Sequence, residues 1–185
     1  MNDRARPPRP TDVGSPLERI PLLLRMLVYG VAFLGVVLVA LPWAFHRIDV
    51  YLPAVHVEIG GFRLVGAVLF AVSLALYLAA SYVLTWRGKG AYVEFDPPKE
   101  LVVTGPYRYV RNPVVTFLLG AMLGEAIGLS STGILLMVCV FVILVHLQIS
   151  RMEEPLLRKR FGRAYEEYCT HVPRWIPRVR PWQGR

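Results

Sequence analysis

Four long apolar stretches constrain the fold of this chain more than any other feature. They cover residues 26–45, 64–85, 113–129 and 132–150. Only the third contains an Asp, Glu, Lys or Arg residue, namely Glu125. An α-helix rises about 1.5 Å per residue, so about 20 apolar residues cross the roughly 30 Å hydrocarbon core of a bilayer. The sequence therefore predicts an all-α integral membrane protein with four transmembrane helices.

Composition and charge agree with this prediction. The chain is 55% hydrophobic, whereas soluble domains are about 45–50% apolar. Its net charge of +8 comes from basic residues at the ends of the apolar stretches, where they meet anionic lipid headgroups. We therefore expect membrane lipids and no nucleic acid as partners, and the pattern does not indicate an oligomeric state. The two cysteines and scattered histidines lack metal-ligand spacing, so no metal site is predicted.

The distribution of Lys and Arg predicts the orientation. Five lie in 1–25, two in 46–63, five in 87–112, none in the 128–133 connection and nine in 151–185. Cytoplasmic segments carry the excess of Lys and Arg. Both termini and the 87–112 segment are therefore predicted to be cytoplasmic, in a multi-pass protein of a bacterial-type inner membrane.

The same pattern divides the chain into four parts. Residues 1–25 form a basic, flexible arm with several prolines, and 26–86 hold the first two transmembrane helices. Residues 87–178 hold a polar segment, a C-terminal helical hairpin and a tail helix, and 179–185 form a short tail. The uncharged connection at 128–133 predicts that the hairpin is tight.

The tail helix is predicted from the spacing of its apolar residues. Leu157, Phe161, Tyr165, Tyr168 and Val172 recur at intervals of three or four residues, which is the helical period. Basic residues occupy much of the opposite face. We expect an amphipathic cytoplasmic helix along the headgroups.

Polar residues at the two ends of the hairpin are the candidates for a site. Arg111 and Asn112 begin the third stretch, and Glu153 and Glu154 follow the fourth. An antiparallel hairpin brings these ends together at the cytoplasmic edge. They form either a small-molecule pocket open to lipid or simply an interfacial ion pair.

Two polar residues lie deeper in the apolar stretches. His146 precedes Glu153 by seven residues, so both lie on about the same helix face. It makes either an inter-helix hydrogen bond or a substrate contact. Glu125 either has an inward function or meets water at the outer end.

Two motifs resemble those of a known superfamily. The segments GPYRYVRNP (105–113) and EEPLLRKRFGRAYEEYCTHVPRWIP (153–177) flank a short apolar hairpin. Together they resemble the membrane methyltransferases, which include isoprenylcysteine carboxyl methyltransferases and phospholipid N-methyltransferases. The resemblance covers roughly residues 90–178 and marks 87–178 as a methyltransferase-like cofactor-binding region.

The resemblance implies S-adenosylmethionine (SAM) as the methyl donor. It places cofactor contacts at Glu100, Leu101, Val102, Tyr107, Asn112, Pro113 and Glu153. The residues expected to act on the substrate are Arg151, His146 and Glu154. The family pattern usually has His where this chain has Asn112 and Tyr where it has Val115. It also has an Arg at the position of Ile149, for which Arg151 is the nearest replacement.

The predicted function is thus a membrane SAM-dependent methyltransferase. Its lipophilic acceptor, which enters from the bilayer, is a prenylcysteine-like carboxylate, a phospholipid amine or another small lipid. The alternatives are an NADPH-dependent membrane reductase related to sterol reductases, or a non-catalytic membrane scaffold.

Overall fold

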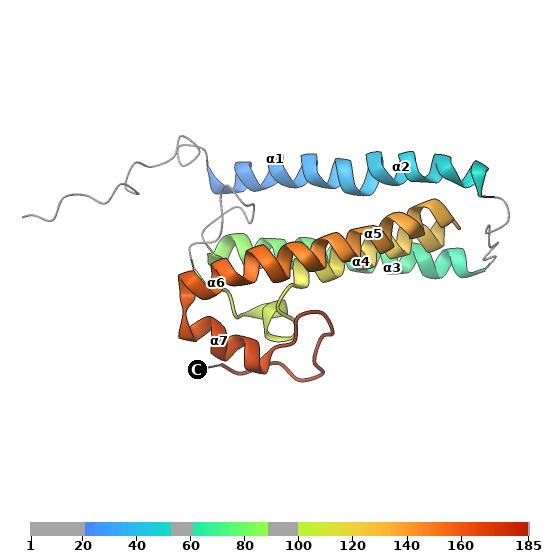
Figure 1. Cartoon of the computed structure of the whole chain (residues 1–185). Coiled ribbons are helices and arrows are strands. Elements are labelled where there is room, and N and C mark those ends of the chain that lie inside the picture. Colours follow the sequence, from blue (N-terminus) through green and yellow to red (C-terminus); the bar gives the residue numbers. More distant parts are fainter. Residues whose placement is uncertain (1–20, 53–60, 89–99, 185) are drawn as a thin grey trace, which may run out of the picture.

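The structure is a computed structural model that describes residues 21–52, 61–88 and 100–184. All regular secondary structure within these ranges is helical (Figure 1). In this view a long helical rod lies along one side of a three-helix bundle, and a folded C-terminal segment lies on the other side. Residues 1–20 of the predicted 1–25 arm, and residues 89–99 of the predicted 87–112 segment, lie outside the described residues.

The first rod contains α1 (Leu22–Gly35), a π-turn η2 (Val36–Ala40), α2 (Leu41–His46) and a 3-10 turn η3 (Arg47–Tyr51). Proline has no N–H to donate to the preceding turn, so the wider turn directly before Pro42 accommodates it. Residues Leu27–Tyr51 are long and apolar enough to cross a membrane. This confirms an apolar helix over the predicted first span.

The bundle consists of α3, α4 and α5. Helix α3 (Phe62–Gly88) has 27 residues, and α5 (Thr132–Gln148) continues through the π-turn η6 (Ile149–Glu153) into α6 (Glu154–Phe161). Both rods are long enough to span a bilayer. Helix α4 (Pro113–Gly128) has 16 residues, which at about 1.5 Å per residue is shorter than the core. The structure therefore shows three candidate spans, and a complete fourth crossing by α4 stays a prediction.

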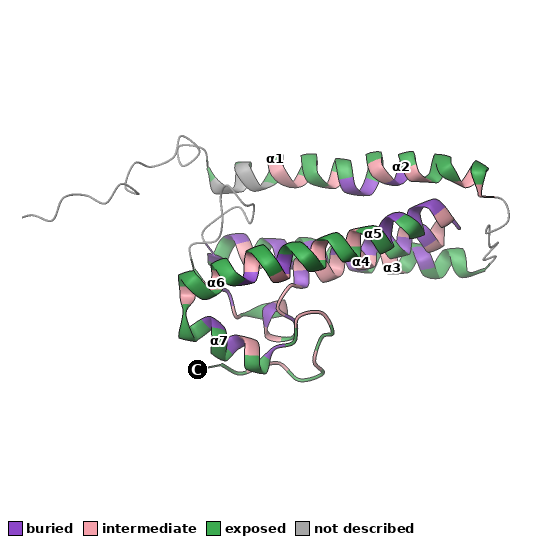
Figure 2. Cartoon of the chain, viewed as in Figure 1, coloured by how far each residue is buried: buried purple, intermediate pink, exposed green. Residues whose placement is uncertain are grey.

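Close packing of α3 on α4 depends on glycine. Gly120, Gly124 and Gly128 lie one helical turn apart along α4. A Cβ atom on Gly66 of α3 would lie 2.7 Å from the Gly124 carbonyl oxygen. Small residues let membrane helices approach this closely. The apolar core lies where these helices meet, whereas most of their outward surfaces are exposed (Figure 2).

The hairpin tip is held at the end of the bundle where the first rod finishes. The Ser131 hydroxyl accepts a hydrogen bond from Ile134 N at 3.1 Å and caps α5. Asp49 of η3 accepts a second one from Gly133 N at 2.6 Å. The tight hairpin is thereby confirmed, and the first rod is fastened to its tip.

The tail forms two short helices where the sequence predicts one. The first, α6, ends at Phe161, and Gly162 adopts φ +53°, a conformation that glycine reaches without steric cost. The chain then turns into α7 (Arg163–His171). The buried face of α7 packs on Leu101 and Val103, and on Trp182 from the end of the described chain. Tyr165, Tyr168 and Val172 are thus covered by protein rather than by headgroups.

Candidate functional site

The segment before α4 is a compact loop against the end of α3. It contains the 3-10 turn η5 (Gly105–Arg108). Gly105 has φ +58°, and a Cβ there would touch Val83 at 3.6 Å. The Tyr107 side chain is buried in this loop. Pro113 occupies the first turn of α4, where its missing N–H has no helical partner to lose.

Residues 172–182, here named the C-terminal strap, are hydrogen-bonded along this loop. Three backbone bonds join them: Arg111 N to Pro173 O (2.8 Å), Arg178 N to Tyr109 O (3.0 Å) and Trp182 N to Arg108 O (2.9 Å). The Tyr168 hydroxyl in α7 donates to the Tyr107 carbonyl at 2.7 Å, and burial raises the pKa of that hydroxyl. The loop and the strap therefore form one folded unit at this end of the bundle.

A buried carboxylate joins this unit to α6. Glu154 is 1% exposed and accepts from Arg174 at 2.6 and 2.9 Å, from Arg111 at 3.2 Å and from Arg158 at 3.2 Å. The hydrogen bond to Glu154, together with its charge, raises the pKa of Arg174. Charge-assisted hydrogen bonds of this kind are the strong ones. The ion pair considered from the sequence is thus formed, with Glu154 as the carboxylate.

The π-turn η6 explains why Glu154, rather than Glu153, faces the strap. A π-turn closes i→i+5 hydrogen bonds and holds one residue more than an α-turn. Because η6 lies between His146 and Glu154, it moves Glu154 toward the face that His146 occupies. These two side chains contact consecutive strap residues, Trp175 and Arg174. On a regular helix, the residue seven positions after His146 is Glu153, which the sequence alone therefore places on the His146 face.

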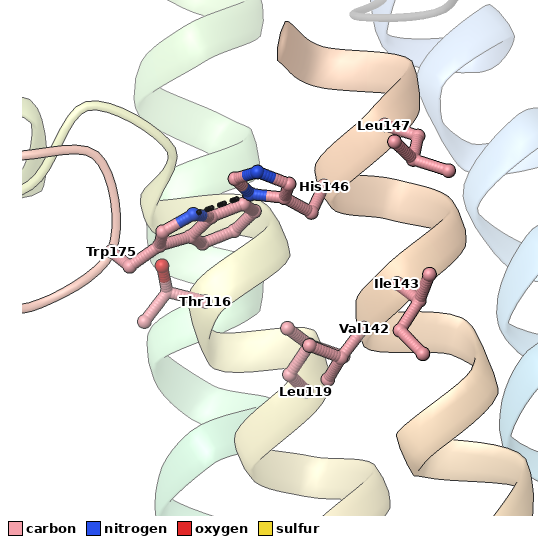
Figure 3. Close-up of a pocket in the computed structure, with 7 residues that line it drawn as sticks. All are labelled: Thr116, Leu119, Val142, Ile143, His146, Leu147 and Trp175. Atoms are coloured by element: carbon pink, nitrogen blue, oxygen red, sulfur yellow. Dashed lines mark hydrogen bonds between the residues drawn. The ribbon is translucent and has the colours of Figure 1, made fainter.

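A groove lies beside this unit, between α4 and α5 (Figure 3). It has a volume of about 530 Å³ and is lined by Thr116, Leu119, Val142, Ile143, His146, Leu147 and Trp175. The Trp175 indole N–H donates to His146 Nδ1 at 3.2 Å. Leu119, Val142 and Ile143 lie along one part of the groove, whereas His146, Trp175 and Thr116 lie close together at its other end. The groove therefore has an apolar length and one polar end.

Several buried polar atoms next to the loop have no hydrogen-bond partner among the described residues. They are Ser81 Oγ and Thr85 Oγ1 on α3, Asn112 Nδ2 before α4, and Thr116 Oγ1 on α4. A buried polar group without a partner costs roughly 1–3 kcal/mol, and such groups call for a bound molecule or water. Glu153 is half-buried and forms no ion pair within the described ranges. These groups fit a polar cofactor with hydroxyl, amine and carboxylate groups, as SAM has.

The structure places the predicted cofactor residues around the same loop, in different environments. Val102, Tyr107 and Pro113 are buried, and Asn112 is half-buried. Leu101 packs into the α7 core. Glu100 is exposed, and its backbone N–H donates to Gly88 O at 3.2 Å.

The predicted substrate residues separate into three environments. His146 lines the groove, Glu154 is enclosed by three guanidinium groups, and Arg151 is exposed on η6. Sequence reasoning missed Arg174 and Trp175. The signal that was available is an Arg-Trp pair within a proline-rich segment that follows the tail helix.

Comparison with known proteins gives one match. A sequence model of a family described as phospholipid methyltransferase matches residues 62–164, from the start of α3 into α7. The match includes the loop, the hairpin and both glutamates, and it ends before the strap. No curated protein and no solved structure matches the chain.

Proposed function

Because this chain belongs to the phospholipid methyltransferase family, we propose that it transfers a methyl group from SAM to a lipid held in the α4–α5 groove. Membership supports a membrane methyltransferase and does not favour the NADPH reductase. Family membership does not by itself specify the donor or the acceptor, and we propose SAM as the donor and a lipid as the acceptor. The observation that carries the proposal is the position of α4. Its N-terminal turn presents unsatisfied polar groups, and its side lines a lipid-sized apolar groove.

We assign the donor site to the polar groups around the loop. The Asn112 amide and the Ser81 and Thr85 hydroxyls offer hydrogen bonds, and the Glu153 carboxylate suits ribose hydroxyls or a cationic amine. When bound, SAM supplies an electrophilic methyl group on a sulfonium sulfur. Among these residues Glu153 is the most informative, because it lies next to Glu154 in sequence and yet forms none of its ion pairs.

The contribution of the protein in this proposal is alignment. In-line transfer to an oxygen or nitrogen needs the two reactants held in contact without intervening water. Positioning of that kind supplies at most about 7–11 kcal/mol of the barrier. Glu154 does not suit the role of proton acceptor, because three guanidinium groups already occupy its oxygens. Its role here is to hold the strap through Arg174.

The same proposal includes an orientation. The loop, α6 and the strap gather many of the basic residues at one end of the bundle. The positive-inside rule then places this end, with the SAM site, in the cytoplasm. A cytoplasmic site is consistent with SAM as a water-soluble donor. Residence in a bacterial-type inner membrane stays a prediction.

Calorimetric titration of the purified protein with S-adenosylhomocysteine tests the donor site. We expect saturable binding, weakened about tenfold by Glu153→Ala, since a hydrogen bond to a charged group contributes about 1.5–3 kcal/mol. Glu166→Ala is the matched control, because Glu166 is exposed on α7. Absence of binding at millimolar ligand, or a Glu153→Ala protein that binds like wild type, would sink the proposal.

A further inference from the structure

The His146–Trp175 hydrogen bond determines which nitrogen of His146 carries a proton. An indole N–H is a donor only, so the Nδ1 atom that it contacts acts as an acceptor. A neutral imidazole with an unprotonated Nδ1 carries its proton on Nε2. In Figure 3 this second nitrogen points away from Trp175. It is therefore available as a hydrogen-bond donor rather than as a proton acceptor.

Trp175 is held in place by bonds to the strap residues directly before it. Pro173 O accepts from Arg111 N at 2.8 Å, and Arg174 binds the Glu154 carboxylate through two nitrogens. The indole also lies 6.0 Å from the His146 ring, centroid to centroid. Because the strap is fixed on both the loop and α6, the indole reaches the groove in a defined position.

The surroundings of the groove favour an anionic oxygen as the atom that His146 binds. Three guanidinium groups face the Glu154 carboxylate next to Trp175, a surplus of two positive charges. Counting the neighbouring Glu153 carboxylate leaves a surplus of one. The groove walls that lead away from this end are exposed aliphatic side chains, with Ile143 60% and Val142 43% exposed. These walls belong to a rod that is long and apolar enough to lie in the bilayer.

We propose that the groove binds a lipid by its chain and by one anionic oxygen, phosphate or carboxylate, which accepts a hydrogen bond from His146 Nε2. Trp175 is a positioning residue that keeps the proton on Nε2. This inference rests on the proposed function for its biological meaning, but lipid binding itself needs no SAM. His146, expected from the sequence to make an inter-helix hydrogen bond or to act on the substrate, acts here as a headgroup-binding donor.

Native mass spectrometry of the detergent-solubilised protein, without SAM, tests the inference. Three probes carry the same monounsaturated hydrocarbon tail: dioleoyl phosphatidic acid, which has two such tails, and oleic acid and oleylamine, which have one each. We expect the phosphatidic acid or the oleic acid to bind at least about tenfold more tightly than the amine, because a hydrogen bond to a charged oxygen contributes about 1.5–3 kcal/mol. Comparing the two acids shows whether phosphate or carboxylate is preferred. Equal binding of acids and amine overturns the proposal.

Variants of His146 show whether its side chain acts as a hydrogen-bond donor, as a base or only as a structural residue. Gln keeps an N–H donor but takes up no proton, so His146→Gln should retain most acid binding, whereas His146→Leu should lose about tenfold. Trp175→Phe keeps an aromatic ring but removes the indole N–H, and should also weaken acid binding several-fold. Trp43→Phe is the matched control, because Trp43 lies on α2 and does not line the groove. Equal losses in His146→Gln and His146→Leu contradict the donor role, even if Trp175→Phe fails to fold. Failure of the S-adenosylhomocysteine titration alone rejects methyl transfer and leaves this lipid site standing.

Discussion

Because α3 and α4 are in close contact at Gly124, we predict that Gly124→Ala lowers the melting temperature. An added Cβ would lie 2.8 Å from both the Gly66 carbonyl oxygen and Phe70 Cα, and nearer still to Phe70 N. Ordinary contacts begin at 3.4 Å, so each of these three atoms is at least about 0.6 Å too close. All of them belong to the backbone and cannot rotate away. The two helices must therefore separate.

Gly35→Ala provides the reference for the magnitude. Gly35 also lies in a helix, and a Cβ there meets nothing within 4 Å. Both substitutions gain the same intrinsic helix preference of about 1 kcal/mol, so the difference between them isolates the clash. Overpacking of this kind costs about 1–3 kcal/mol. At roughly 2–4 °C per kcal/mol for a chain of this size, Gly124→Ala should melt at least about 2 °C below Gly35→Ala.

Thermal unfolding in detergent, followed by circular dichroism at equal lipid and detergent content, is the measurement. Titration with S-adenosylhomocysteine adds a second readout, because α4 begins at the predicted cofactor residues Asn112 and Pro113. We expect binding to weaken in Gly124→Ala and to stay unchanged in Gly35→Ala. A Gly124→Ala protein that melts at or above Gly35→Ala would refute the close approach of the two helices.

Two further predictions concern the unit formed by the loop, α7 and the strap. Glu154→Gln should lower the free energy of unfolding by about 1.5–3 kcal/mol, because it leaves the partly buried guanidinium of Arg174 without its charged acceptor. A larger loss for Glu153→Gln in thermal melts would contradict this. Burial raises the pKa of Tyr165 and Tyr168 above the ordinary value of 10.0. The unfolded chain then releases these protons at lower pH than the folded chain, so stability should fall as pH rises above about 10. Melting temperatures measured from about pH 8 to about pH 11, a range that includes the ordinary tyrosine pKa, should show this fall. Tyr168→Phe should make the fall shallower. An unchanged slope in that variant would contradict the role given to buried Tyr168.

Much of the fold was predictable because it depends on hydrophobic length and local turn chemistry. The apolar stretches correspond to helices, and the uncharged connection at 128–133 corresponds to the tight hairpin, which the Ser131 cap holds in the structure. Antiparallel topology alone brought Arg111 to the acidic residues after α5, and the Arg111–Glu154 ion pair confirms it. Helix α4 differs, because its length does not separate a spanning helix from one packed against its neighbour α3.

The parts that could not be predicted depend on contacts distant in sequence or on helix phase. The π-turn at Ile149–Glu153 changes which glutamate faces the strap. Its mark in the sequence is Pro155, which follows the turn with the same spacing as Pro42 follows η2, but a proline does not by itself specify which glutamate then faces the strap. The break at Gly162 turns a predicted headgroup-facing surface into a protein core. Tyr168 and Tyr107 are 61 positions apart, so helical periodicity carries no information about their hydrogen bond.

The position of the strap near the end of the chain also determines when the groove can be completed during synthesis. Arg108 and Trp182, which are hydrogen-bonded through the Trp182 carbonyl, lie 74 positions apart. A ribosome therefore makes every apolar helix before it makes Trp175, the strap residue that lines the groove. Insertion into the bilayer can finish while the loop still lacks its partner. The groove acquires its polar end only once the chain has emerged past Trp175, so a nascent chain that is already in the membrane has no oriented His146 with which to hold a lipid.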